Sequence, residues 1–248
     1  MNKTDKIHAC AKQLGLSNLA NKAFGFLDEP VSNEDFLIDC LNEEIAYREE
    51  KAKQRRMKQA QLPTYKGFDA FDTEFQKGIT DWQLKQLEAL TWVDGIYNLI
   101  LIGPPGTGKT HIALATANKA LEAGYKVFFA TMDNLIHILK TQEISIKSAA
   151  RLKWIRGCDL LVIDELGYLP VGKVEANLFF QLISHLYENT SVLITSNKGF
   201  DGWADLLGDS VLATALLDRL THRCQVLSFT DDSYRLAHRK EIFKKEKS

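Results

Sequence analysis

The run Gly-Pro-Pro-Gly-Thr-Gly-Lys-Thr at residues 103–110 constrains this chain more than any other feature. It follows a short apolar run that ends at Ile102, and a helical pattern begins at Lys109. The form G-x-x-x-x-G-K-T between a strand and a helix is typical of a phosphate-binding loop. Its glycines let backbone N–H groups surround phosphate oxygens, and the helix N-terminus adds a partial positive charge. The sequence therefore predicts an α/β fold that binds a nucleoside triphosphate.

The loop and the residue after it are the candidate nucleotide-binding residues. Lys109 is expected to reach the β and γ phosphates, and the Thr110 hydroxyl is expected to bind Mg²⁺. His111 has no partner at metal or catalytic spacing, so a role in the core or on the helix surface is the default for its ring. The full set is Gly103, Pro104, Pro105, Gly106, Thr107, Gly108, Lys109, Thr110 and His111.

From residue 98 onward, short apolar runs alternate with helical patterns. Strands that are apolar on both faces, each followed by a helix, are typical of a parallel sheet covered on both sides. We therefore expect a five-stranded parallel sheet sandwiched by helices. The predicted strands are 98–102, 126–130, 159–163, 192–195 and 225–229, and the predicted helices are 109–123, 133–140, 149–155, 174–187 and 210–222.

Polar side chains follow two of these strands. Asp164 and Glu165 end the apolar run 160–163, and Asn197 follows the next strand. Beside a phosphate-binding loop, the first acid can hold Mg²⁺ and the second can act as general base on water. Asn197 can orient that water, because ligands of open parallel sheets sit at the carboxyl ends of the strands. The alternatives are surface acids at a strand end and an asparagine that forms a turn.

The first third of the chain is expected to be helical. Residues 32–35, Ser-Asn-Glu-Asp, fit a capping box, and a helix should run from there to about residue 60. Pro63 ends it, and an aromatic-rich connector follows. We therefore predict a small all-α N-terminal domain at residues 1–64, which binds DNA or a partner protein, and a second domain at residues 65–248.

Charge is balanced overall but unevenly placed. The chain has 31 basic and 32 acidic residues and a net charge of -1, which argues against a uniformly basic nucleic-acid binder. Residues 51–66 nevertheless hold six basic residues, among them Arg55 and Arg56, and no acidic one. This stripe can contact phosphates, or it can be a solvated helix face. Because no signal peptide or membrane span is readable and four distant cysteines suggest reduced thiols, we expect a cytoplasmic protein without zinc.

Several motifs together resemble the AAA+ ATPases of the helicase-loader clade. The motifs are GPPGTGKT, LLVIDE, TSN, LLDRL at residues 216–220 and DSYR at residues 232–235. The phrases IDELGY, LITSNKGF and LLDRLTHR make the chain most similar to the IstB-type transposition helper proteins, with DnaC-like helicase loaders as near relatives. The resemblance covers residues 65–245. It implies a P-loop NTPase of the AAA+ type, with ATP rather than GTP as the nucleotide and Mg²⁺ as the metal.

The resemblance also implies roles for individual residues. Asp164 and Glu165 match the metal-binding acid and the catalytic base, and Asn197 looks like the sensor 1 residue. Arg219 falls where the family places an arginine near a neighbouring subunit's γ phosphate, with Arg223 as the second candidate. Arg235 resembles the sensor 2 arginine. Few residues follow the last strand, so a single C-terminal helix at about residues 231–247 is expected in place of a larger lid.

The segment 135–156 is longer than one crossover helix requires. In the resembling clade, an extra helical element here touches the DNA backbone inside a spiral assembly. That implies phosphate contacts by Lys140, Lys147 and Arg151, with a solvated helix face as the alternative.

The leading hypothesis is an ATPase that assembles as a homo-oligomeric spiral or ring on duplex DNA. It would assist a cognate transposase in target selection and strand transfer, with ATP bound between subunits. The alternative is a DnaC-like loader of a replicative helicase, in which the N-terminal helices grip the helicase. A small-molecule kinase is the weakest reading, because no acceptor-binding lid is evident.

Overall fold

The computed structural model describes residues 3–21, 32–167 and 171–238. The chain divides into two compact units, Met1–Arg55 and Arg56–Ser248. The division falls within the long helix α2 (Asn33–Ala60). The assignment of residues 1–64 and 65–248 to two functional domains stays a prediction.

In the first unit, one buried carboxylate organises the turn after helix α1 (Lys3–Gln13) and the short helix η1 (Leu19–Asn21). Glu44 on α2 is 3% exposed. Its oxygens accept the backbone N–H groups of residues 17, 18 and 19 at 3.1, 2.8 and 3.3 Å. Arg48, one turn further along α2, donates its Nε to Glu44 at 2.9 Å and its Nη2 to the Gly15 carbonyl at 2.8 Å. The predicted start of α2 is confirmed, since the Asp35 N–H donates to Ser32 Oγ at 3.1 Å.

The second unit is built on a parallel sheet of five strands, as predicted. Its order is β2-β3-β4-β1-β5, and every neighbouring pair is parallel. The strands are β1 (Asn98–Ile102), β2 (Val127–Thr131), β3 (Leu160–Leu166), β4 (Ser191–Ser196) and β5 (Cys224–Ser228). β3 extends past its predicted end at residue 163, so the acidic pair lies within the strand rather than after it.

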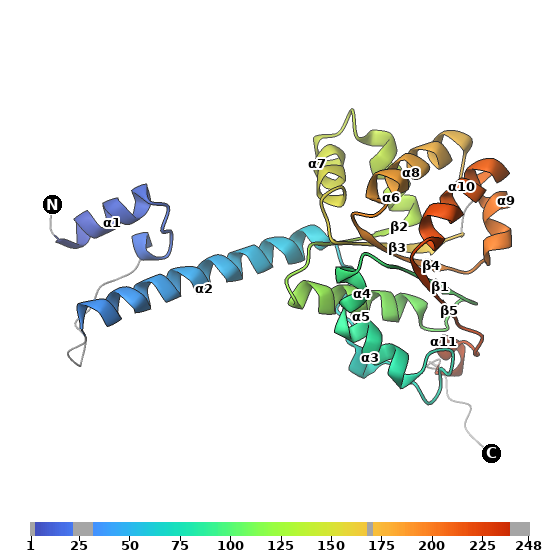
Figure 1. Ribbon diagram of the computed structural model, residues 1–248, viewed down its shortest axis with the longest axis horizontal. Coiled ribbons are helices and arrows are strands. Elements are labelled where there is room, and N and C mark those ends of the chain that lie inside the picture. The colour runs from blue at the N-terminus through green and yellow to red at the C-terminus, as the bar shows by residue number, and fades with distance from the viewer. Residues whose placement is uncertain (1–2, 22–31, 168–170, 239–248) are drawn as a thin grey trace, which may run out of the picture. The chain divides into compact units, whose positions relative to one another are not determined.

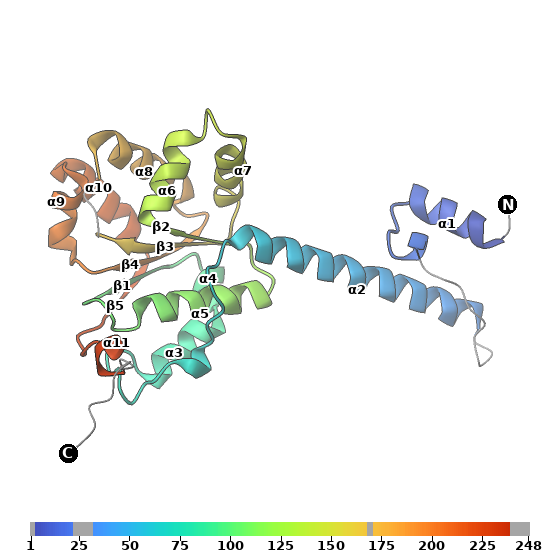
Figure 2. The same cartoon turned by 180° about the vertical axis from the view of Figure 1, so that it is seen from behind.

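Helices cover both faces of this sheet (Figures 1 and 2). Side chains alternate across each strand, so Ile100 of β1 packs into the core on one face while Leu99 and Leu101 pack on the other. The first face carries α6 (Met132–Thr141), α7 (Ile146–Ile155), α8 (Lys173–Leu186), α9 (Trp203–Leu207) and α10 (Ser210–Thr221). The second carries α3 (Asp81–Ala89), α4 (Thr91–Asp94) and α5 (Lys109–Glu122).

Three short helices complete the described chain: η2 (Phe68–Ala70), η3 (Phe200–Gly202) and α11 (Tyr234–Ala237). α11 is shorter than the C-terminal helix predicted at about residues 231–247: it begins at Tyr234 and ends at Ala237, with His238 as its C-cap. Residues 239–247 lie outside the described residues. In the described part of the chain, no helix combines the length and the apolar character that crossing a bilayer requires.

The crossovers of the sheet bring three strand ends together. Because β4 lies between β1 and β3, the carboxyl ends of these three strands are adjacent. Ligands of open parallel sheets bind at such ends, where the strand order changes direction. The loop after β1, the acids of β3 and the end of β4 are therefore expected at one site.

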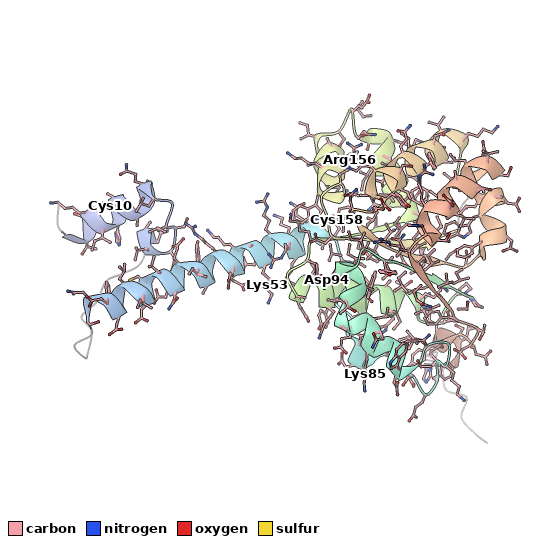
Figure 3. The ribbon with its side chains drawn as sticks, viewed as in Figure 1. Cys10, Lys53, Lys85, Asp94, Arg156 and Cys158 are labelled. Carbon is pink, nitrogen blue, oxygen red and sulfur yellow. The ribbon has the colours of Figure 1, made fainter. Side chains whose placement is uncertain are left out.

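The four cysteines are free thiols. Cys158, labelled in Figure 3, lies between α7 and β3. Its burial raises the pKa of the thiol to about 12, and the nearby Asp159 charge adds to this. A thiol with so high a pKa carries little thiolate and is chemically inert at neutral pH.

The Glu44 contacts predict that the turn of the first unit depends on this carboxylate. Burial alone would raise the pKa of Glu44, but hydrogen bonds from Arg48, Asn18 and Leu19 and the Arg48 charge hold it below its usual 4.5. A depressed acid pKa stabilises the fold above the unfolded pKa, and this stabilisation is lost as pH falls through the folded pKa. In Glu44→Gln, the amides of residues 17–19 should exchange hydrogen roughly tenfold faster or more at pH 7.

The matched control is Glu49→Gln, since Glu49 is exposed on the same helix. As the pH of the wild-type protein falls below 4.5 and through the lower folded-state pKa of Glu44, the protection of these amides relative to the unfolded chain should fall as it does in Glu44→Gln. Equal exchange rates in wild type and Glu44→Gln would show that the carboxylate does not hold the turn.

Candidate active site

The loop between β1 and α5 needs glycine at defined positions. Gly103, Gly106 and Gly108 have φ values of +155°, +86° and +93°. A Cβ at Gly103 would lie 2.1 Å from the Phe229 carbonyl oxygen, and one at Gly108 would lie 2.6 Å from the Phe71 ring. These glycines therefore serve close backbone packing as well as the left-handed turns that let N–H groups line an anion site.

The Lys109 ammonium is held against the carbonyl oxygens of its own loop. Nζ donates to the Gly103 oxygen at 2.7 Å and to the Pro104 oxygen at 2.6 Å. Burial lowers the pKa of Lys109 to about 8; the Asp164 charge partly offsets this, and the Arg235 charge adds to it. The Asp164 charge therefore does not fully offset the cost of burying the Lys109 ammonium, and an anion bound beside this ammonium would be stabilised.

Two hydroxyl groups meet one carboxylate oxygen at the centre of the site. Thr110 Oγ1 on α5 donates to Asp164 Oδ1 on β3 at 3.0 Å, and Thr195 Oγ1 on β4 donates to the same oxygen at 2.5 Å. By giving its proton to Asp164, the Thr110 hydroxyl leaves its lone pairs free for a metal. Mg²⁺ prefers oxygen ligands, usually one or two carboxylates together with water and phosphate. The donor set of this chain therefore fits Mg²⁺.

Thr110 and Thr195 line a cleft of about 480 Å³. Glu165 and Asn197 line it from the ends of β3 and β4, and Arg235 lines it from α11. Asn197 Oδ1 is buried and has no hydrogen-bond partner among the described residues. An amide oxygen left unpaired in a buried position has an unused capacity to accept a hydrogen bond.

The cleft brings together most of the predicted site residues. The predicted residues that line it are Pro105, Gly106, Gly108, Lys109, Thr110, His111, Glu165, Asn197 and Arg235. Asp164 lies beneath it and accepts a hydrogen bond from Thr110. Thr107 lies buried within the loop and donates its hydroxyl proton to the Pro104 oxygen at 2.9 Å. Gly103 lies at the loop's start, where its carbonyl receives Lys109.

Arg219 does not lie in this cleft. Its guanidinium donates to the Ala215 oxygen at 3.0 Å and lies over the Phe180 ring, 4.7 Å from the centroid. With Arg223, it borders a small hollow that includes Asn98, the first residue of β1. The phosphate-binding loop follows the other end of β1, so Arg219 cannot reach the nucleotide of its own chain. A role at a neighbour's nucleotide stays a prediction.

The residues predicted to contact DNA lie on α2, α6 and α7. Lys140 on α6 is paired with Glu175 at 2.7 Å, and Arg151 on α7 donates to Gln61 Oε1 at 2.8 Å. Lys147 is exposed on α7. Arg55 is exposed at the end of the first unit, and Arg56 is half-buried at the start of the second.

Sequence reasoning missed how the connector and the chain after β5 close one side of the cleft. Gln76 Nε2 donates to the Asp232 oxygen at 3.0 Å, and the Gly78 N–H donates to an Asp231 carboxylate oxygen at 2.6 Å. The Tyr234 N–H then donates to the Gly106 oxygen at 3.0 Å. We call these two segments, residues 75–78 and 231–235, the cleft clasp.

The residue after the loop also holds the connector. A His111 ring nitrogen lies 2.9 Å from the Gly67 oxygen, and the ring meets Phe71 edge to face at 5.6 Å. The helix-surface role expected for His111 is therefore a contact with a cleft-lining segment. The aromatic-rich connector was the signal for this, but its partners are up to 156 residues away in sequence.

Comparison with known proteins identifies the family. The family described as IstB-like ATP binding protein matches residues 9–242. The chain belongs to this family. It is 37% identical over 240 residues to an insertion sequence IS21 putative ATP-binding protein of Pseudomonas aeruginosa, covering 95% of this chain and 91% of that one. It is 38% identical over 237 residues to an IS21-like putative ATP-binding protein of Bacteroides fragilis, covering 94% and 90%.

Solved structures confirm the AAA+ fold of this IstB-like chain. DnaI is similar with a TM-score of 0.55 and 20% identity, over 66% of this chain and 91% of that one. DnaA from Aquifex aeolicus bound to AMPPCP is similar with a TM-score of 0.53 and 20% identity, over 70% and 53%. The DnaC helicase loader is similar with a TM-score of 0.50 and 25% identity, over 61% and 92%. The predicted resemblance is thus confirmed.

The depressed pKa of Lys109 predicts a cost to stability. Between its folded pKa of about 8 and its ordinary 10.5, the unfolded chain binds more protons, so wild-type stability should rise with pH there. At pH 7, Lys109→Met should raise the free energy of unfolding of the nucleotide-free protein by about 1–2 kcal/mol, a value reduced because the ammonium is partly solvated. The difference should shrink as the pH approaches 10.5.

Chemical denaturation at pH 7 and pH 10 measures this. Lys119→Met is the control: Lys119 is exposed on the same helix, and a hydrogen bond to Glu88 raises its pKa. That variant should not be stabilised. A Lys109→Met protein that is less stable than wild type at pH 7 would contradict the prediction.

Proposed function

We propose that this IstB-like chain is a Mg²⁺-dependent ATPase that assembles on duplex DNA and assists the transposase of its insertion sequence in target selection and strand transfer. The single observation that carries the hydrolytic part is the convergence of Thr110 and Asp164 beneath a cleft that Lys109 and Glu165 line. The transposition part is supported by the family and by the insertion-sequence names of the relatives.

Each residue of the cleft has one task in this proposal. Mg²⁺, when bound, offsets the negative charge of the β and γ phosphates. Lys109 binds the same phosphates, and the Thr110 hydroxyl and Asp164 hold the metal. Glu165 accepts a proton from the attacking water, and Asn197 Oδ1 orients that water by accepting its other hydrogen. Arg235 of the subunit that binds the nucleotide stabilises negative charge on the phosphates, and Arg219 of the neighbouring subunit does the same across the interface.

DNA binding is supported by basic residues that the cleft does not use. Lys147 and Arg55 are exposed. Lys140 is paired with the Glu175 carboxylate and Arg151 with the neutral Gln61 amide, and a phosphate could replace either partner. Contacts of this kind are sequence-independent and weaken with salt, because binding releases counterions from DNA. Assembly on long duplex DNA rather than base-specific recognition is what such residues favour.

The proposal predicts assembly that needs both ATP and duplex DNA. Sedimentation or light scattering should show large complexes with ATP, Mg²⁺ and long duplex, and their affinity should fall steeply as salt rises from about 50 to 200 mM. Glu165→Gln should keep the assembly while hydrolysis falls by about 100-fold or more, because only proton transfer is lost. Lys109→Ala should lose both nucleotide binding and assembly.

The helicase-loader alternative has a different outcome in the same experiment. It is favoured by the similarity to DnaC. A preference for single-stranded DNA, or no response to any DNA until a replicative helicase is added, would favour the loader. ATP hydrolysis by Lys109→Ala at the wild-type rate would contradict both hypotheses, because each places the nucleotide at Lys109.

The location of Arg219 predicts rescue by mixing subunits. Arg219→Ala keeps an intact cleft, and Glu165→Gln keeps both an intact arginine and the ability to assemble, so each protein alone should hydrolyse ATP at least about tenfold more slowly than wild type. Mixed assemblies contain interfaces that pair one intact cleft with one intact arginine. Mixing should therefore restore part of the activity, with a maximum at intermediate ratios.

Mixing Asn197→Ala with Glu165→Gln is the control, because both changes lie in the same cleft and no hybrid interface holds a complete site. Absence of rescue by Arg219→Ala at every ratio, with wild-type assembly size, would contradict the trans role. The same test on Arg223→Ala decides between the two arginines.

A further inference from the structure

Strand β3 carries one extra residue at the point where its acids lie. Ile163 is level with Ile194 of β4, but Leu166 is level with Ser196. Asp164 and Glu165 therefore share a single opposite residue, Thr195. This is a β-bulge, a local insertion that turns a side chain away from its regular position and is frequent beside active sites.

The backbone of Glu165 shows the effect of the bulge. Its φ is +64°, a left-handed conformation that non-glycine residues rarely adopt. A conformation of this kind persists when surrounding contacts hold it. The contact here is a hydrogen bond from the Glu165 N–H to Thr195 Oγ1 at 3.0 Å.

The same hydroxyl also fixes the second acid. Thr195 Oγ1 donates its proton to Asp164 Oδ1 at 2.5 Å. A threonine hydroxyl offers one donor and can accept in return, so it satisfies both neighbours at once. Thr195 is 2% exposed, and the residues before it on β4, Leu193 and Ile194, pack into the cores on the two faces of the sheet. Loss of the hydroxyl would leave an unpaired N–H and an under-supported carboxylate in a buried site.

We propose that Thr195 is a positioning residue for ATP hydrolysis: its hydroxyl sets the geometry of Asp164 and Glu165 together, so that metal binding and water activation depend on one side chain. This inference rests on the proposed function, in which Asp164 holds Mg²⁺ and Glu165 is the base. Thr195 lines the cleft, but its hydroxyl is engaged by Asp164 and Glu165, so its proposed role is exerted through both acids.

The test compares three substitutions. Thr195→Val keeps the branched shape and removes the hydroxyl, and Thr195→Ser keeps the hydroxyl. Thr116→Val is the matched control, because Thr116 is fully buried on α5 in the same unit and its Oγ1 has no partner among the described residues. A general effect of replacing a buried threonine by valine would appear in both valine variants.

Two readouts separate positioning from a loss of structure. The first is the affinity for a fluorescent ATP analogue with and without Mg²⁺, by titration of the full chain. Thr195→Val should bind the analogue like wild type in EDTA but lose about tenfold or more of the gain in affinity that Mg²⁺ gives. The second is steady-state ATP hydrolysis, whose kcat should fall by about 10- to 100-fold in Thr195→Val, the range typical of residues that orient metal ligands. Thr195→Ser should recover most of both losses, and Thr116→Val should show neither.

Three outcomes would overturn the inference. They are an unchanged Mg²⁺ effect and kcat in Thr195→Val, a loss in Thr195→Ser as large as in Thr195→Val, and an equal loss in Thr116→Val. If Thr195→Val does not fold by circular dichroism, Thr195→Ala replaces it against the same serine variant. A wild-type protein that binds ATP with Mg²⁺ but hydrolyses none would contradict the proposed function, while the Mg²⁺ effect on binding would still test the role of Thr195 toward Asp164.

Discussion

The site depends on one carboxylate oxygen that accepts two hydroxyl protons. Asp164 Oδ1 joins Thr110 at the start of α5 to Thr195 at the end of β4, with β3 between them. These elements are separated by 54 and 31 residues in sequence, so the bond pair forms only when the sheet has its native order. Charge-assisted hydrogen bonds are among the stronger polar contacts, and here they fix Asp164 and Thr110, the side chains that we propose as ligands of Mg²⁺. The fold and the chemistry therefore share the same contact.

The sequence predicted well what depends on local pattern. The five strands and the helices between them follow from apolar runs that are buried on both faces, and the loop 103–110 follows from its glycines and lysine. The meeting of Asp164, Glu165 and Asn197 at one edge followed from their places after strands, since parallel strands end at a common edge. The resemblance to the IstB-type family added Arg235 to this site, and the structure places it in the cleft.

What sequence could not predict are features that arise from long-range register. The bulge of β3 depends on how β3 pairs with β4, and no local pattern marks Glu165 as left-handed. Such a backbone costs roughly 1–3 kcal/mol, and the cost must be met by neighbours that only the folded chain supplies. The order of the strands and the partners of Phe71 and Gln76 also depend on contacts between residues that are far apart in sequence. The pKa of Lys109 follows from burial, which composition does not reveal.

The cleft clasp links the two ends of the second unit's chain at the nucleotide site. Residues 76 and 78, which lead into the sheet, are hydrogen-bonded to residues 232 and 231, which follow it, and the Tyr234 N–H donates to the Gly106 oxygen. A displacement of the C-terminal segment would therefore reach the loop 103–110 directly, through the hydrogen bond between Tyr234 and Gly106.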